Sequence, residues 1–240
     1  MIFNVAILSI DKHMPRAHST VGHLESVGFK VCRLIREDRI RIYKGADYRD
    51  DLHAYFKEMR NEGFGDHYEN FLRNENLLIK HIAAFNFGYA KILKHVSESE
   101  HPTLVISSDV YIGRSYRTLA KRWNMLVDAV GLENINVAML YHKNNGNQPT
   151  EDINDIWVRG SLGNGDTANI WTPHGAKHYL NLKSDRHIET FLGNNQMAGI
   201  YTHRKQCIWF SWARWIDNGD INHQKVEYQQ AKDFADGYKL

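Results

Sequence analysis

Apolar and polar residues alternate along the chain in blocks that predict strands and helices in turn. Short apolar runs at Phe3–Ile10, Phe29–Ile35 and Thr103–Ser107 predict strands. The last of these is continuously apolar, which is typical of strands buried in the middle of a parallel sheet. Three further strands are expected later in the chain, at Asn136–Tyr141, Ile156–Arg159 and Thr167–Trp171. Strands alternating with helical patterns over the first two thirds of the chain predict an α/β layered domain.

Helices are predicted where apolar residues recur every three or four positions. The clearest runs from about Asn74 to Val96, and its apolar stripe includes His81. Thr172 followed by Pro173 predicts another helix start, with threonine as the N-cap and proline in the first turn. Other helices are expected at Pro15–Gly28, at Asp50–Arg60, from Tyr116 to Val130, and in the polar C-terminal tail.

Composition places the chain among globular proteins. Its 240 residues include 30 Lys+Arg and 28 Asp+Glu, a formal charge of only +2, with 12% aromatic residues and 4 prolines. These values exclude disordered and collagen-like chains. The apolar stretches are too short to span a bilayer, and the N-terminus lacks the basic region of a signal peptide. Cys32 and Cys207 are far apart and are interpreted as buried free thiols, so we expect a cytoplasmic protein.

Candidate chemistry follows the predicted strand ends, because ligands of open α/β sheets bind at the carboxyl ends of the strands. Ser9 and Asp11 follow the first strand, Asp109 follows the central one, and Asp166 closes a Gly-rich turn that begins at Gly160. An ionised Asp109 directly after a buried strand must meet water, a metal ion or a polar ligand. A carboxylate among hydroxyls suits Mg²⁺ or Mn²⁺ with phosphate ligands, whereas capping of the next turn is an equally good interpretation.

Four blocks in order resemble glycosyltransferase family 25, which contains lipooligosaccharide and procollagen galactosyltransferase-like enzymes of GT-A fold. LLIKHIAAFNFGYA followed by HPTLVISSDV is similar to the family's Ser-His and acidic motifs, with His81 and Asp109 at the matching positions. The N-terminal block places Arg16 at the arginine of the family's donor loop. TANIWTPHGAKHYL and RHIETFL resemble two later blocks, the second with Glu189 in place of aspartate. The resemblance covers most of residues 4–205.

This resemblance implies a GT-A-like, Rossmann-related fold, with a mixed, mainly parallel sheet flanked by helices. It also implies one domain over residues 1–240, in which residues 1–142 bind a nucleotide sugar and residues 143–240 form the acceptor half and tail. The donor would be a nucleotide-diphosphate sugar such as a UDP-sugar, and the acceptor a hydroxyl on a glycan, a lipid-linked sugar or a lipooligosaccharide. The residues assigned to the donor are Ser9, Asp11, Arg16, Ser108, Asp109 and Tyr111.

The acidic motif departs from the family. Where the family reads Glu-Asp-Asp-Val, this chain reads Ser107-Ser108-Asp109-Val110, so a single carboxylate remains. Asp109, with His203 as a further ligand, still allows a Mn²⁺ or Mg²⁺ ion. Either the metal site is weaker than in the family or the enzyme works without a metal.

Transfer with inversion also needs a group that takes the proton of the acceptor hydroxyl. Asp166, after the flexible turn, and Glu189, at a family position, are the two candidates, with Glu189 slightly ahead. Taken singly, each of them is also open to interpretation as an ordinary surface carboxylate.

A basic run leaves two alternative functions open. Arg114, Arg117, Lys121 and Arg122 recur at helical spacing just beyond Asp109, either as a solvated face or as a contact for a phosphate-rich acceptor. The chain is then either a glycosyltransferase of a hydroxymethylated or otherwise modified DNA base, or a non-catalytic module of this fold that binds sugar nucleotides or nucleic acid.

Overall fold

The structure is a computed structural model of residues 1–240, and it describes 4–29, 40–46, 54, 57, 77–108, 110–143, 148–182, 187–205 and 207–210. Several sequence predictions lie outside these residues. They are the strand after Phe29, most of the helix at 50–60, Asp109, and the C-terminal tail. Within the described residues, no helix is both long and apolar enough to cross a membrane.

Ten strands are found among the described residues, and eight of them form one sheet in the order β2-β1-β3-β8-β5-β9-β7-β6. The remaining two, β10 and β4, pair separately. The strands are β1 (Asn4–Ser9), β2 (Ile40–Lys44), β3 (Thr103–Ser107), β4 (Val110–Ile112), β5 (Val137–Met139), β6 (Glu151–Asp152), β7 (Trp157–Arg159), β8 (Ala168–Trp171), β9 (Ile200–His203) and β10 (Ile208–Phe210). Every strand predicted within the described residues is present, with ends shifted by one or two residues.

The sheet is mixed, so the expectation of a mainly parallel sheet is not confirmed. β1 runs parallel to β2 and β3, and β5 runs parallel to β9. β8 lies between β3 and β5 and is antiparallel to both, and β7 is antiparallel to β9 and β6. All four residues of β8 are buried, as in a central strand. A fully buried apolar run indicates cover on both faces, but it does not encode the direction of the strand.

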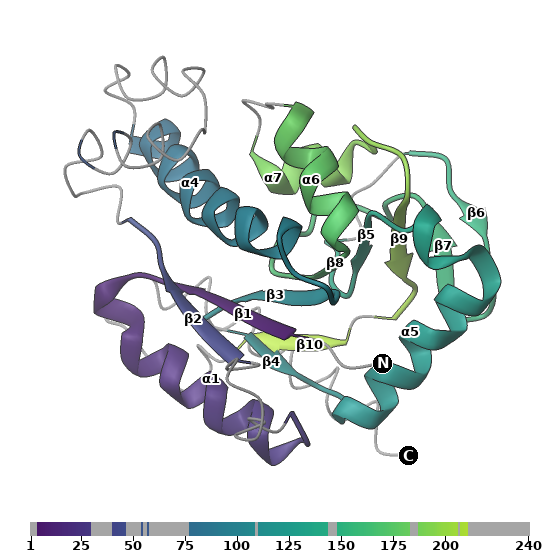
Figure 1. Ribbon diagram of the computed structural model, residues 1–240, viewed down its shortest axis with the longest axis horizontal. Helices are drawn as coiled ribbons and strands as arrows, with labels where there is room; N and C mark the ends of the chain where they lie inside the picture. The colour runs from purple at the N-terminus through teal and green to yellow at the C-terminus, as the bar shows by residue number, and fades with distance from the viewer. Residues whose placement is uncertain are drawn as a thin grey trace.

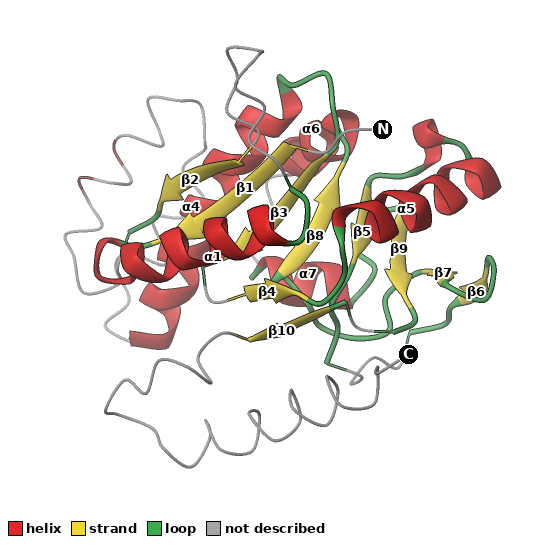
Figure 2. Ribbon diagram, turned by 90° about the horizontal axis from the view of Figure 1, so that it is seen from below, coloured by secondary structure: helices red, strands yellow, loops and turns green. Residues whose placement is uncertain are grey.

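Helices cover both faces of the sheet (Figure 1, Figure 2). α4, α6 and α7 pack on one face, over alternate strand residues such as Val105 and Met139. α1 and α5 pack on the other face, over residues such as Leu104 and Ile106. The helices are α1 (Met14–Ser26), α4 (Leu77–Ser97), α5 (Tyr116–Val130), α6 (Pro173–Leu182) and α7 (Ile188–Gly193), with short 3₁₀ turns η1 (Asp11–His13) and η3 (Leu132–Asn134). This confirms a mixed α/β domain flanked by helices.

The predicted start of α6 is confirmed in detail. The hydroxyl of Thr172 accepts a hydrogen bond from the amide of Gly175 at 3.1 Å, as an N-cap does. The same hydroxyl donates to the carbonyl of Ile135 at 2.7 Å, which ties the helix start to the segment before β5. The cap therefore sets both where α6 begins and where it sits on the sheet.

The register of the sheet brings several strand ends to one edge. Ser108 donates its amide to the carbonyl of Leu8, so the ends of β1 and β3 are neighbours. The amide of Ser107 donates to the carbonyl of Thr167, so the start of β8 lies beside the end of β3. β5 and β9 end at the same edge, because β5 is antiparallel to β8 and parallel to β9. This carboxyl edge is where ligands bind in open α/β sheets.

Leu104 tests the assignment of the core. It is fully buried in β3, so Leu104→Ala leaves a cavity and is expected to lower the free energy of unfolding by about 2–5 kcal/mol. Leu182→Ala, at the 44% exposed end of α6, serves as the control and is expected to cost less than about 0.5 kcal/mol. Urea denaturation of both variants measures the difference, and equal costs would contradict this core.

Candidate functional site

Asp166 reaches the carboxyl edge through the Gly-rich turn before β8. Gly165 packs directly against the carbonyl oxygen of Tyr141, so closely that a Cβ atom there would overlap it. The amide of Lys143 donates to the carbonyl of Asn164 at 2.9 Å, and the amide of Leu140 donates to that of Ala168 at the same distance. These backbone hydrogen bonds join the segment after β5 to the turn before β8, so Asp166 and Lys143 lie side by side.

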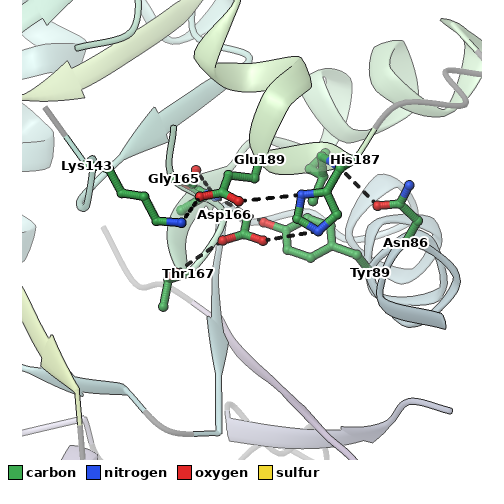
Figure 3. Close-up of polar contacts among 10 residues, drawn as sticks. Asn86, Tyr89, Lys143, Gly165, Asp166, Thr167, His187 and Glu189 are labelled. Atoms are coloured by element: carbon green, nitrogen blue, oxygen red, sulfur yellow. Dashed lines mark hydrogen bonds and ion pairs between the residues drawn. The ribbon is translucent and has the colours of Figure 1, made fainter. Parts of the chain in front are cut away.

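Four charged or titratable side chains from three segments meet at this point (Figure 3). His187 and Glu189 come from the start of α7, Asp166 from the turn before β8, and Lys143 from the loop after β5. The ammonium of Lys143 lies 2.5 Å from Oε1 of Glu189. The ring of His187 lies between the two carboxylates, with Nε2 at 3.8 Å from Oδ2 of Asp166 and Nδ1 at 3.7 Å from Oε2 of Glu189. We call these four residues the acid–base cluster.

Three of the four side chains in the acid–base cluster are largely shielded from solvent, whereas that of Lys143 is 51% exposed. The side chains of Asp166, His187 and Glu189 are only 14%, 17% and 17% exposed. Burial, and then the negative charge of Glu189, raise the pKa of Asp166 to about 7, against smaller opposing effects of the Thr167 hydroxyl and Lys143. A carboxyl group with that pKa exchanges its proton near neutral pH, as a general acid or base does.

Buried polar contacts hold the cluster against α4. The side-chain oxygen of Asn86 accepts a hydrogen bond from the amide of Ile188, which fixes the start of α7. The ring of Phe85 packs on that of His187 at a centroid distance of 5.3 Å. The Tyr89 hydroxyl, whose pKa burial raises above its usual range, accepts hydrogen bonds from Asn169 and Trp171 on β8. These contacts fix α7 and β8, from which Glu189 and the turn with Asp166 extend, against α4.

This arrangement has two chemical capacities. Two adjacent carboxyl groups, one held beside an ammonium and the other with a pKa near 7, can accept and return a proton. Asp166, His187 and Glu189 also offer ligand atoms that all lie within 4.8 Å of one another, which are the donor types of a divalent metal site. Lys143 already places a positive charge against Glu189, which favours proton transfer as the role of this cluster.

Three of the residues assigned to the donor, Ser9, Asp11 and Ser108, lie along the edge at the ends of β1 and β3. Ser9 is 3% exposed, and Ser108 is 6% exposed with its carbonyl accepting a hydrogen bond from Thr20 of α1. Asp11 is largely exposed and forms an ion pair with Lys44 at 2.5 Å.

Arg16 is half-buried in the first turn of α1, and Tyr111 lies in β4 opposite Trp209. Asp109 lies outside the described residues. The donor roles of all these residues stay predictions.

His203 ends β9 at the same edge, but its surroundings are cationic. It is 1% exposed, and its Nε2 lies 3.0 Å from a guanidinium nitrogen of Arg122. Burial, followed by the charge of Arg122, lowers the pKa of His203 to about 3. A divalent cation beside a guanidinium is repelled, so these surroundings disfavour a metal ion at His203. The metal role assigned to His203 stays a prediction.

The structure thus brings together Asp166 and Glu189, the two carboxylates predicted from the sequence, and adds His187 and Lys143, which sequence reasoning missed. His187 stands two residues before Glu189 in the block RHIETFL, so that spacing was the available signal. Lys143 opens the polar loop after β5, where nothing in its neighbours distinguishes it from an ordinary solvated lysine. His203 packs with Arg122 of α5, on the face of the sheet opposite to α4 and α7.

Comparison with models of known protein families and with curated proteins finds no match to this chain. The likeness to glycosyltransferase family 25 therefore rests on the sequence blocks alone.

Gly165 provides a test of how the turn positions Asp166. Gly165→Ala pushes a methyl group into the Tyr141 carbonyl and is expected to lower the free energy of unfolding by about 1–3 kcal/mol. Gly22→Ala is the matched control, because Gly22 is exposed within α1 and a Cβ there meets nothing within 4 Å. That change is expected to stabilise the protein by about 0.5–1 kcal/mol. Thermal unfolding with the same sign for both variants would contradict the close approach.

Carboxyl NMR titration tests the electrostatics of the cluster. Wild-type Asp166 is expected to titrate near pH 7, and Glu189→Gln is expected to lower its pKa because a neighbouring negative charge is removed. The pKa should stay above the usual 3.8, since burial is the larger cause and remains. Glu151→Gln, which changes a 62% exposed carboxylate paired with Arg159, is the control and should leave the Asp166 titration unchanged. A wild-type Asp166 that titrates near pH 4 would refute this description.

Proposed function

We propose that the protein is a nucleotide-sugar-dependent glycosyltransferase with a GT-A-like domain, which moves a sugar from a nucleotide-diphosphate sugar to an acceptor hydroxyl. One observation carries the proposal. Asp166 and Glu189, the carboxylates expected to take the acceptor's proton, meet at the carboxyl edge of the sheet. Asp166 precedes Thr167, whose carbonyl accepts a hydrogen bond from the amide of Ser107 at the end of β3, and Asp109 follows that strand in the chain. The candidate proton acceptor thus neighbours the strand end at which we propose that the donor binds.

Within this proposal Asp166 is the base, because its pKa near 7 lets it accept a proton at neutral pH and release it again. The carboxylate of Asp166 takes the proton of the acceptor hydroxyl as that oxygen bonds to the anomeric carbon. The bond from the anomeric carbon to the diphosphate breaks with its electron pair, so the nucleoside diphosphate leaves and the configuration inverts. Glu189, held by Lys143, keeps Asp166 basic through its own negative charge.

The donor would bind along the ends of β1 and β3. Ser9 and Ser108 lie there, with the backbone of both strand ends, and Arg16 on α1 is a candidate partner for the diphosphate. A Mn²⁺ or Mg²⁺ ion bound through Asp109 remains part of the proposal, and when bound it would supply positive charge to the leaving diphosphate. The acceptor is expected to be a glycan or a lipid-linked sugar, as the resemblance implies.

One observation favours the alternative acceptor, a modified base in DNA. Arg117 and Lys121 are both exposed and stand one turn apart on α5, so they form a basic strip on the surface. Such a strip can contact phosphates along a nucleic acid backbone. DNA binding that weakens steeply as salt rises would support this acceptor, and salt-insensitive or absent binding would leave the glycan.

A transfer assay with UDP-sugars and a panel of hydroxyl acceptors tests the proposed reaction. Asp166→Asn is expected to lower the transfer rate about 100-fold or more, because a neutral amide accepts no proton. The wild-type rate should rise with pH through about 7, as Asp166 loses its proton. Asp128→Asn, an exposed change on α5, is the control and should keep the full rate. Full activity in Asp166→Asn would overturn the assigned base.

Two further measurements bear on the donor side and on the non-catalytic alternative. Full activity in Asp109→Ala would overturn the donor or metal role of that residue. Calorimetry with UDP-sugars, with and without Mn²⁺, reports binding independently of turnover. Binding without transfer to any acceptor would favour a sugar-nucleotide binding module over an enzyme.

A further inference from the structure

His203 sits in a place where hydrogen-bond donors outnumber acceptors. Its Nδ1 faces the backbone amide of Lys205 at 3.1 Å, and its Nε2 faces the guanidinium of Arg122 at 3.0 Å. A neutral imidazole has one acceptor nitrogen and one N–H group, so it can accept from only one of these two donors. Whichever tautomer is present, one N–H of the ring points at another donor. The low pKa of His203 agrees with a ring that stays neutral.

Arg122 has only neutral partners among the described residues. Its Nη1 contacts His203 and, at 3.6 Å, the sulfur of Cys207, a buried thiol whose pKa is raised to about 11. No carboxylate in the described part of the chain pairs with Arg122, and its Nε and Nη2 have no acceptor there. A half-buried guanidinium of this kind keeps N–H donors that can bind the oxygen atoms of an anionic group.

The place where these residues meet is built from three segments at the carboxyl edge. The amide of Cys207 donates to the carbonyl of Leu140 after β5, and the amide of Gly113 after β4 donates to the carbonyl of Cys207. Arg114 and His142 approach closely enough to influence the proton affinity of His203. Arg114 and Arg122 are half-buried and Lys205 is exposed, so the cluster borders on solvent.

We propose that Arg122, with His203 and Arg114, forms a binding site for a phosphoryl group, and that its ligand is the diphosphate of the sugar donor. Phosphoryl oxygens accept hydrogen bonds and carry negative charge. One such group could therefore accept from the surplus N–H donors and pair with the guanidinium of Arg122, which has no carboxylate partner among the described residues. The assignment to the diphosphate rests on the proposed glycosyl transfer, whereas the anion site itself rests on the contacts of Arg122 and His203.

The position of this site agrees with its proposed ligand. His142 is close enough to His203 to influence its proton affinity. The next residue, Lys143, forms the ion pair with Glu189 in the acid–base cluster. The diphosphate would therefore sit on one side of the loop after β5 and the acceptor's base on the other. A transferred sugar must lie between a leaving diphosphate and the incoming hydroxyl when the configuration inverts.

Calorimetry at low salt with pyrophosphate, UDP and uridine tests the site without any turnover. Pyrophosphate and UDP are expected to bind and uridine to bind much more weakly. Arg122→Met is expected to weaken pyrophosphate and UDP binding at least tenfold, and Arg122→Lys less, because lysine keeps the charge and loses the planar fork. Lys177→Met, which removes one positive charge from an exposed position on α6, is the control and should leave pyrophosphate and UDP binding unchanged.

The outcomes separate the possible ligands and the two proposals. Equal binding of pyrophosphate by wild type and Arg122→Met would overturn the anion site. If the wild type binds neither pyrophosphate nor UDP, and Arg122→Met weakens its binding to a short DNA duplex, the diphosphate assignment is overturned in favour of nucleic acid phosphates. Intact pyrophosphate binding without sugar transfer would reject the proposed reaction and leave the anion site standing. Trp157 donates to the main-chain carbonyl of Arg122, which every variant keeps, and thermal unfolding verifies that each variant is folded.

Discussion

The structure depends on the insertion of β8 between β3 and β5. β8 is hydrogen-bonded on both sides and joins the parallel group β2-β1-β3 to the parallel pair β5-β9 through two antiparallel ladders. It runs in the opposite direction, so its first residues lie where β3 and β5 end. A residue that precedes β8 therefore reaches the carboxyl edge, where loops usually follow strands. The placement of Asp166 beside the end of β3 is a direct result.

Charge is divided sharply along this edge. On the side covered by α4 and α7, Glu189 pairs with the ammonium of Lys143, and burial together with the negative charge of Glu189 raises the pKa of Asp166. On the side covered by α5, Arg122 and Arg114 gather around a neutral histidine. The near balance of 30 basic and 28 acidic residues in the whole chain conceals this local separation. A reaction that removes a proton and releases a diphosphate requires such a division, with a base on one side and positive charge on the other.

Much of the fold was predictable, because its signals are local. The apolar run of β3, the stripe of α4 and the Thr172 cap are each set by residues within a few positions of one another. The direction of β8 was not predictable, because a buried strand has the same apolar sequence pattern in a parallel and in an antiparallel ladder. Asp166 and Glu189 could be selected by their place after a turn and in a sequence block. Their contacts with Lys143 and His187 arise only from packing between distant segments, and so does the pairing of His203 with Arg122.

The loop after β5 contributes residues both to the acid–base cluster and to the proposed anion site. His142 and Lys143 are consecutive residues, so one peptide bond separates the residue that influences His203 from the residue that pairs with Glu189. If anion binding at Arg122 shifted this dipeptide, the proton affinity of the acid–base cluster would change as well. Thermodynamic linkage makes such an effect equal in both directions, so an anion that changes the proton affinity of Asp166 would itself bind with a pH-dependent strength. The two sites would then be coupled, so that binding of the first ligand changes the affinity for the second.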